Sequence, residues 1–556
     1  EFAAVTPYYY ATYEGGSAPV GVDYVPGLDE SLKQRIVVIG SGPIRIGQGI
    51  EFDYGCVHAV GAIRDLGHEA IIINNNPETV STDFDTSDRL YFDPLTLESV
   101  SEVLLRERAH GILLQFGGQT AINLALPLAG NMPHLSTMGL HLVMEGTSPD
   151  AVDEASDRER FETFAARNGL RMPRGSTATT PEEVRRAVHE IGYPVLIRPS
   201  YVLGGRGMEI LSTDKQLDAY MDEAYLAPDR PLLIDEYLGN AIELDVDAVC
   251  DGDEVLVGAI MEHLEEAGIH SGDSTCFIPP QNIAEHVLAE VEDWTKRIGI
   301  ELGIRGCFNI QYAIRDEVLY VLEVNPRGSR TFPFVAKATG VPLARIAARL
   351  AIGDKLADLD VPMPQTDAVC VKAPVFPFIK LRGLDPAPGP EMKSTGEVMG
   401  SHVRASAAYL KARLATELPV PVEGGVYITV KDGDKLAIID EARRLQEMGF
   451  TLYATRGTSH VLRDVGGLDV QTCYRIAERR SPDALDLMRQ GKIHLIINTP
   501  RSTGGAVLDG NMMRRLAVEL NIPFVTTMAG AHMEVEAIQE AMNGMPEPRL
   551  LEIGSL

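Results

Sequence analysis

Three oxygen-bearing side chains on two predicted strands have the types and spacing of a divalent metal site. Glu323 and Asn325 are two residues apart in a strand-like run, so both project to one face of it. If the strand predicted over 308–314 pairs with this run through an odd-length loop centred on Glu317, Gln311 lies opposite Glu323. One carboxylate and two amide oxygens suit Mg²⁺ or Mn²⁺ already neutralised by phosphates, since such ions take few protein ligands.

Two arginines directly after the second strand extend this site toward an anion. Arg327 and Arg330 follow Pro326, and their guanidinium groups could hold an anionic substrate or a transferring phosphoryl group. Together with Glu323, they are the residues that we expect to act in catalysis. The alternative is a solvated hairpin end without a ligand, and the residues alone leave it open.

A glycine-rich segment between two predicted strands has the composition of a loop that closes over a polyphosphate. The strand predicted over 193–198 ends on Arg198, and another strand resumes at 208–211. Gly204 and Gly205 free backbone N–H groups to face phosphate oxygens, while Arg198 on the rigid strand can hold a phosphate that does not react. An ordinary β-hairpin is the alternative, but it does not explain why arginines flank the glycines on both sides.

Two weaker signals concern the segment that follows. Glu236, Leu238 and Glu243 surround the edge of a predicted strand and offer a seat for adenine and for ribose hydroxyls. His270 stands in a polar turn, where a loop histidine without a function is as good an interpretation as a ligand contact. Neither signal identifies a ligand by itself.

The glycine-rich turn at 40–47 fits neither common nucleotide fingerprint. Arg45 occupies the third glycine position of a dinucleotide motif, and Gln48 replaces the lysine of a phosphate-binding loop. A strand-to-helix turn that points N–H groups at an anion remains, with simple close packing as the alternative.

The overall composition excludes several classes of protein. With 50 Lys and Arg against 79 Asp and Glu, the net charge of −29 repels nucleic acid and anionic lipid, so any anionic substrate must be held by local basic groups. The 6 scattered cysteines form no CxxC pair or zinc cluster, which indicates a reducing, cytoplasmic setting and small buried core residues. No membrane span, secretion signal or covalent nucleophile system is recognisable. Because the sequence begins with Glu1 rather than Met, we expect a fragment or a processed product.

The order of predicted elements divides the 556 residues into several domains. Alternating strands and helices predict a parallel α/β domain over 31–150, after a linker over 1–30. Mixed helices and strands predict an α+β domain with a C-terminal extension over 151–418. Strand and helix alternate again over 419–556, which predicts a second, smaller doubly wound domain.

Five longer segments contain many of these residues: GSGPIRIGQGIEFDY at 40–54, NNNPETVSTDFDTSDRLYF at 74–92, RPSYVLGGRGMEI at 198–210, GIHSGDS at 268–274 and EVNPRGSRTFPF at 323–334. Together they resemble the C-terminal half of the carbamoyl phosphate synthetase large subunit over nearly the whole sequence. The resemblance implies a pre-ATP-grasp α/β domain, an ATP-grasp domain and a methylglyoxal-synthase-like domain for allosteric effectors, with the end of an oligomerisation domain in the first residues. The implied activity is ATP-dependent phosphorylation of carbamate to carbamoyl phosphate, for arginine and pyrimidine biosynthesis.

The resemblance also implies roles for single residues. ATP contacts are implied at Arg158, Arg198, Glu236, Leu238, Glu243, Gly268, Ile269, His270, Ser271, Gln311 and Glu323. Metal ligands, for two Mg²⁺ or Mn²⁺ ions per site, are implied at Gln311, Glu323 and Asn325, and phosphate and carbamate contacts at Arg327 and Arg330. Effector contacts are implied at Lys435, Thr455, Thr458 and Asn498.

The implied partners are the N-terminal half of the large subunit, on the same polypeptide or a separate one, a glutaminase small subunit, and a nucleotide or other effector. Two other functions are alternatives: a regulatory half that senses ATP without turnover, and an ATP-grasp ligase that acts on another carboxylate. Intact Glu323, Asn325, Arg327 and Arg330 argue against the regulatory alternative.

Overall fold

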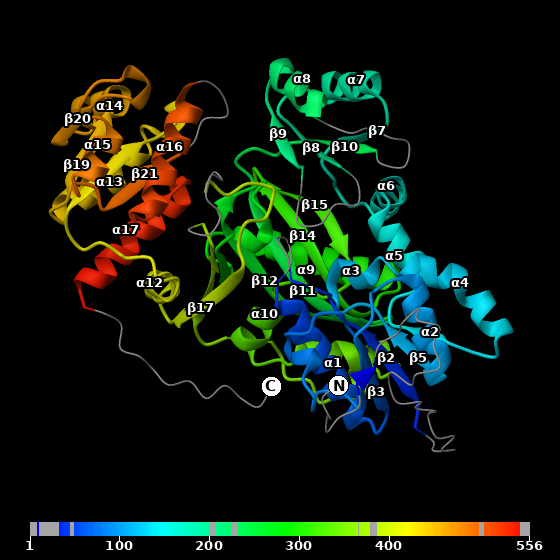
Figure 1. Ribbon diagram of the computed structural model, residues 1–556. Coiled ribbons are helices and arrows are strands. Elements are labelled where there is room, and N and C mark those ends of the chain that lie inside the picture. The colour runs from blue at the N-terminus through cyan, green and yellow to red at the C-terminus, as the bar shows by residue number, and fades with distance from the viewer. Residues whose placement is uncertain are drawn as a thin grey trace, which may run out of the picture.

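In the computed structural model, the described residues form four β-sheets, from the blue first sheet to the orange C-terminal sheet in Figure 1. The structure describes residues 8–9, 33–44, 49–199, 207–223, 231–364, 366–378, 386–499 and 505–544. All six cysteines are free and buried, as predicted. Within the described ranges, no helix has the length and apolar character needed to cross a membrane.

The first sheet is the parallel α/β core that the sequence predicts. Its strands run in the order β1-β4-β3-β2-β5-β6, and every pair is parallel. Alternate residues of β2 pack against α1 on one face and against α2 and α4 on the other, so both faces are buried. The elements are β1 (Tyr8–Tyr9), β2 (Arg35–Ile39), β3 (Glu69–Ile73), β4 (Arg89–Tyr91), β5 (Gly111–Leu113), β6 (Val143–Glu145), α1 (Glu51–Asp65), α2 (Leu97–Glu107), α3 (Gly118–Ile122) and α4 (Ala125–Thr137). Tyr8 and Tyr9 are the described part of the predicted linker, and they pair with β4.

A small antiparallel sheet follows, with the strand order β7-β10-β8-β9. Its helix α7 begins with a capping box at Thr180 and Glu183 and packs its apolar face on the sheet. The elements are α5 (Pro149–Ser156), α6 (Arg158–Arg167), β7 (Gly175–Ala178), α7 (Pro181–Ile191), β8 (Val195–Pro199), β9 (Glu209–Leu211), α8 (Asp214–Glu223) and β10 (Leu232–Glu236). Figure 1 shows this sheet as a separate layer beyond the central sheet.

The central sheet is antiparallel and has seven strands in the order β15-β14-β11-β12-β13-β16-β17. On β11, β14 and β15, the apolar residues of the alternating pattern pack against α9, so the polar residues between them point to the opposite face. The elements are β11 (Ile242–Asp251), β12 (Val255–Glu266), β13 (Cys276–Ile278), α9 (Glu285–Glu301), β14 (Arg305–Arg315), β15 (Val318–Asn325), α10 (Phe332–Thr339), α11 (Leu343–Ala351), β16 (Val369–Val375), β17 (Gly396–His402) and α12 (Ala405–Ala415).

The C-terminal sheet is parallel, with the strand order β20-β19-β18-β21-β22, and it confirms the second doubly wound domain. Its helix α17 packs on α12, which joins it to the central sheet. The elements are β18 (Gly425–Thr429), α13 (Ile438–Glu447), β19 (Thr451–Thr455), α14 (Arg456–Asp464), β20 (Val470–Cys473), α15 (Ala484–Arg489), β21 (Leu495–Asn498), α16 (Gly505–Glu519), β22 (Phe524–Val525) and α17 (Met528–Met542). Short 3₁₀ turns occupy η1 (Val80–Thr82), η2 (Ser271–Asp273), η3 (Leu356–Asp358), η4 (Asp432–Asp434) and η5 (Ile476–Glu478).

Candidate active site

A cavity of about 390 Å³ lies between the small antiparallel sheet and the polar face of the central sheet. The residues predicted for ATP, metal and phosphoryl binding come together there from distant parts of the sequence. Those that line the cavity are Arg158, Arg198, Glu236, Leu238, Glu243, Gly268, Ile269, His270, Ser271, Gln311, Glu323, Asn325, Arg327 and Arg330. Gly204 and Gly205 lie outside the described residues.

The β14–β15 hairpin sets the register of the predicted metal ligands. Gln311 pairs with Glu323, as predicted. The odd-length loop centred on Glu317 was wrong, however, because Asp316 and Glu317 form a two-residue turn with φ of 54° and 60°. This turn shifts the register by one residue, and a β-bulge opposite the step from Gln311 to Tyr312 shifts it back.

Contacts on this hairpin link the carboxylate, the amide and two arginines. Asn325 Nδ2 donates to Glu323 Oε1 at 2.9 Å, and Arg327 Nη2 donates to Asn325 Oδ1 at 3.0 Å. Arg198 on β8 brings its Nη1 to 3.5 Å from Glu323 Oε2. Burial lowers the pKa of Arg327, while Glu323 opposes this effect. The cluster therefore joins one negative charge to two positive ones in the wall of the cavity.

The far end of the cavity is lined by carboxylates that arginines and backbone hold in place. Arg158 Nη2 lies 2.8 Å from Asp235 Oδ1. Burial favours the neutral form of Glu236, but Arg174 and Arg315 outweigh it and lower the pKa of Glu236. Glu243 Oε1 accepts a hydrogen bond from the backbone N–H of Gly268 at 2.9 Å. These groups offer fixed donors and acceptors to a ligand.

Arg330 is the more enclosed of the two predicted phosphate arginines. Its Nη2 and Nε lie 2.9 and 3.3 Å from the two carboxylate oxygens of Glu51, at the start of α1 in the first domain. Both side chains are under a tenth exposed. Glu51 was not among the predicted site residues, although an acidic residue at the end of the glycine-rich turn was a signal for it. The first domain thus contributes a carboxylate that holds Arg330, and Arg330 lines the cavity.

The turn that carries His270 is fixed by hydrogen bonds within it and by hydrogen bonds from a distant segment. His270 Nδ1 accepts a hydrogen bond from Gly272 N at 3.0 Å, so the neutral ring carries its proton on Nε2. Burial lowers the pKa of His270, which favours this neutral form. The Asp273 carboxylate accepts from the N–H groups of Lys393 and Ser394 at 2.8 and 2.9 Å. Both donors follow a proline-rich connection, and nothing in its sequence predicted that it contributes to the site.

A buried acidic cluster lies behind the metal-type ligands, and no residue pattern predicted it. Asn309 Nδ2 donates to Asp247 Oδ1 at 2.9 Å, and Thr331 Oγ1 donates to Asp247 Oδ2 at 2.7 Å. Burial and the nearby Asp245 raise the pKa of Asp247 to about 6, against the effect of its hydrogen bonds. His263 Nε2 lies 3.0 Å from Asp245 Oδ2. The polar face therefore contains buried carboxylates next to the cavity.

A second cavity of about 390 Å³ lies in the C-terminal domain. The four residues predicted for an effector, Lys435, Thr455, Thr458 and Asn498, all line it. The cavity is basic, because Lys and Arg side chains outnumber carboxylates in its wall. The basic residues are Lys431, Lys435, Arg456, Arg475 and Arg514. The first turn of α14 also faces it, which adds backbone N–H groups suited to an anion.

Comparison with known families assigns most of the sequence. Residues 32–154 match the carbamoyl phosphate synthase preATP-grasp domain, residues 157–359 the carbamoyl-phosphate synthase L chain ATP binding domain, and residues 437–526 an MGS-like domain.

Two curated relatives are similar over 98% of the protein. The carbamoyl phosphate synthase large chain of Methanothrix thermoacetophila is 50% identical, and the match spans 49% of that protein. The C-terminal section of the carbamoyl phosphate synthase large chain from Methanocaldococcus jannaschii is 48% identical, and the match spans 88% of it. The protein thus corresponds to about half of a full-length relative.

Solved structures support the fold. N5-carboxyaminoimidazole ribonucleotide synthetase in an ADP complex aligns with a TM-score of 0.52 at 14% identity, over 69% of this protein and 96% of that one. The biotin carboxylase domain of Hydrogenobacter thermophilus 2-oxoglutarate carboxylase aligns with a TM-score of 0.52 at 18% identity, over 69% and 89%. At such identity the likeness concerns the fold alone.

Proposed function

The chain belongs to the carbamoyl phosphate synthase large-chain family, and from that premise we propose that its central cavity phosphorylates carbamate with ATP. The observation that carries the proposal is the convergence of Gln311, Glu323 and Asn325 with Arg198 and Arg327 in one cavity. An ATP-sensing half without turnover would need nucleotide contacts, but it would not need this arrangement of metal-type ligands and guanidinium groups.

The proposed reaction is an in-line transfer of the γ-phosphoryl group. A carbamate oxygen attacks the γ-phosphorus, the bond to the bridging oxygen of ADP breaks, and carbamoyl phosphate and ADP leave. Gln311, Glu323 and Asn325 would hold Mg²⁺ or Mn²⁺, which supplies neutralisation of the phosphate charge when bound. Arg327 and Arg330 would hold the carbamate and the transferring group.

The nucleotide would occupy the rest of the cavity. Arg158 and Arg198 would bind phosphate oxygens, and Glu236, Leu238 and Glu243 would contact adenine and ribose; all five line the cavity. The backbone from 268 to 271 would line the phosphate tail, with His270 as a neutral donor through Nε2.

The same premise suggests partners for the protein. A second synthetase half would supply carbamate, and a glutaminase subunit would supply ammonia to that half. We assign the basic cavity of the C-terminal domain to a phosphate-bearing effector that contacts Lys435, Thr455, Thr458 and Asn498.

The reverse partial reaction tests the catalytic proposal. The purified protein is supplied with ADP, Mg²⁺ and carbamoyl phosphate, and ATP formation is followed with a luciferase coupling. We expect ATP to form, and not to form when acetyl phosphate replaces carbamoyl phosphate. A protein that binds ATP but forms none from carbamoyl phosphate, even with its partners present, would be a regulatory half; equal use of acetyl phosphate would indicate another carboxylate ligase.

A further inference from the structure

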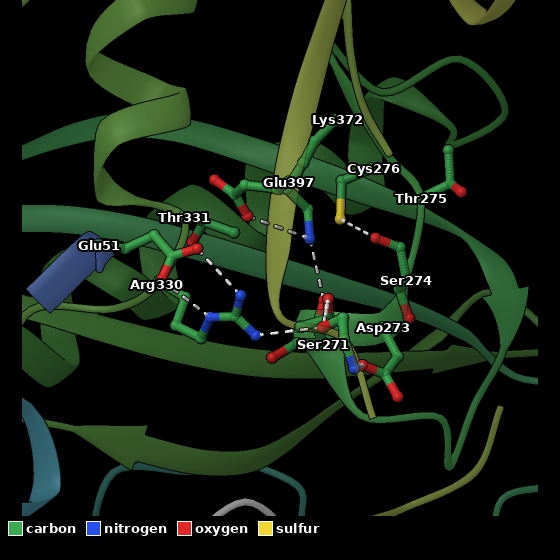
Figure 2. A network of polar contacts seen from close by, with 12 residues as sticks. Glu51, Ser271, Asp273, Ser274, Thr275, Cys276, Arg330, Thr331, Lys372 and Glu397 are labelled. Carbon is green, nitrogen blue, oxygen red and sulfur yellow. Dashed lines mark hydrogen bonds and ion pairs between the residues drawn. The ribbon is translucent and has the colours of Figure 1, made fainter. Parts of the chain in front are cut away.

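Lys372 is a fully buried lysine on β16, immediately behind the cavity (Figure 2). Its Nζ donates to the backbone oxygen of Ser271 at 3.1 Å and lies 3.8 Å from Glu397 Oε2 on β17. Burial opposes its charge, but Cys276 and Glu397 favour it, so the pKa of Lys372 is raised and the ammonium is kept. A cation therefore stands behind the turn whose front faces the candidate site.

Several polar contacts hold this turn, and Figure 2 shows the one between Lys372 and Ser271. Lys372 holds the oxygen of Ser271, Ser394 Oγ donates to the oxygen of Gly272 at 2.9 Å, and the Asp273 carboxylate accepts two backbone N–H groups. Arg330 Nη1 lies 3.3 Å from the same Ser394 Oγ. The turn and the phosphate-type arginine are thus fixed by one network, in which Lys372 provides a full charge.

Stability alone does not account for a lysine at this position. A buried ion pair commonly contributes less than well-packed apolar side chains of the same volume, because both charges lose water. Glu397 Oε2 is buried without a hydrogen bond among the described residues, and burial raises the pKa of Glu397 to about 7. The contact with the carboxylate is long, at 3.8 Å, and the shorter contact of Lys372 is the one with the backbone oxygen of Ser271, at 3.1 Å.

We propose that Lys372 is a positioning residue, which holds the Ser271 carbonyl so that the turn from His270 to Asp273 keeps its place against the phosphate tail. The expected effect on kcat rests on the proposed function of the cavity, whereas the positioning role itself does not. Glu236 and Leu238, which we propose to contact the nucleoside, have no contact with Lys372, so we expect nucleoside binding to depend little on it.

The experiment uses Lys372→Met, which keeps the length of the side chain, and the double variant Lys372→Met/Glu397→Gln, which also removes the unpaired carboxylate. The matched control is Arg413→Met/Glu534→Gln, because Arg413 and Glu534 form a buried ion pair (3.1 Å) between α12 and α17 that does not line the cavity. ATP formation from ADP and carbamoyl phosphate gives kcat and KM, and titration with ADP gives the affinity.

We expect both Lys372 variants to lose at least about tenfold in kcat, equal to about 1.4 kcal/mol, with ADP affinity changed less than about threefold. The control should retain kcat. Recovery of kcat in Lys372→Met/Glu397→Gln would overturn the proposal, since it would mean that Lys372 only neutralises Glu397.

Amide hydrogen exchange provides a readout that does not need turnover. Exchange in a peptide covering 268–276 should rise at least about tenfold in both Lys372 variants, while a peptide covering 308–314 stays unchanged. Equal exchange in wild type and variants would contradict the proposal even if the protein is active. If the wild type makes no ATP but the variants still exchange faster, the catalytic function is refuted and the positioning role is retained.

Discussion

Lys431 Nζ and Glu266 Oε1 lie 3.2 Å apart, between the basic cavity of the C-terminal domain and the candidate active site. Lys431 lines the basic cavity of the C-terminal domain, and its backbone N–H donates to Thr499 Oγ1 at 2.8 Å. Glu266 ends β12, and Ala267 and Gly268 directly after it line the candidate active site. An anion bound beside Lys431 would compete with Glu266 for the ammonium group of Lys431.

The ion pair predicts that the two cavities are coupled. With wild-type protein, inorganic phosphate should change the affinity for ADP, and Lys431→Met or Glu266→Gln should remove that change. Because both groups are about a third exposed, the coupling should stay within about 1 kcal/mol, or roughly fivefold. Titrations of ADP with and without phosphate measure it, and Lys435→Met, which weakens the phosphate site alone, is the control. A double variant that loses more than either single variant would argue against this route.

Replacement of Glu323 should separate catalysis from folding. Glu323→Gln removes the negative charge of the predicted metal ligands, so ATP formation should fall at least about a hundredfold, and the Mg²⁺ concentration for half-maximal rate should rise. Glu317→Gln changes a three-quarters exposed carboxylate at the turn of the same hairpin and should leave both quantities unchanged. An unaltered Mg²⁺ dependence in Glu323→Gln would remove Glu323 from the metal site.

Glu51→Gln tests the pair that joins the first domain to the cavity. Removing the carboxylate leaves Arg330 buried without its counter-charge, so the free energy of unfolding should fall by about 3 kcal/mol, as measured in urea. The double variant Glu51→Gln/Arg330→Met should recover part of this loss, because no unpaired charge remains. If the double variant is less stable than Glu51→Gln, the two residues do not act as an ion pair.

The sequence predicted the parts of the site that depend on local geometry. Alternation along a strand places Glu323 and Asn325 on one face, and a hairpin of about the right length brings Gln311 to them. The error in the turn was compensated by a bulge that no residue pattern indicates. The predicted pairing of Gln311 with Glu323 is therefore correct, but it depends on a bulge that was not predicted.

Contacts between distant segments could not be predicted in this way. Glu51 and Arg330 are 279 residues apart and meet because two domains pack together. Lys372 stands in a strand whose other residues are all apolar, so only its burial and the nearby turn indicate a function. Each of these residues is a charge whose partner is set by tertiary structure rather than by spacing.

Asp247 predicts a measurable dependence of stability on pH. Its pKa of about 6 in the folded protein lies above the ordinary value of 3.8, so its protonated form favours the folded state. This contribution is present in full below pH 3.8 and is lost as the pH rises through 6. Relative to Asp247→Asn, the free energy of unfolding of the wild type should therefore fall by up to about 3 kcal/mol between about pH 3.8 and pH 7. Urea unfolding of both proteins across this range measures the difference. A difference that stays constant, or grows with pH, would mean that Asp247 is ionised in the folded protein throughout, with the hydrogen bonds from Asn309 and Thr331 outweighing its burial.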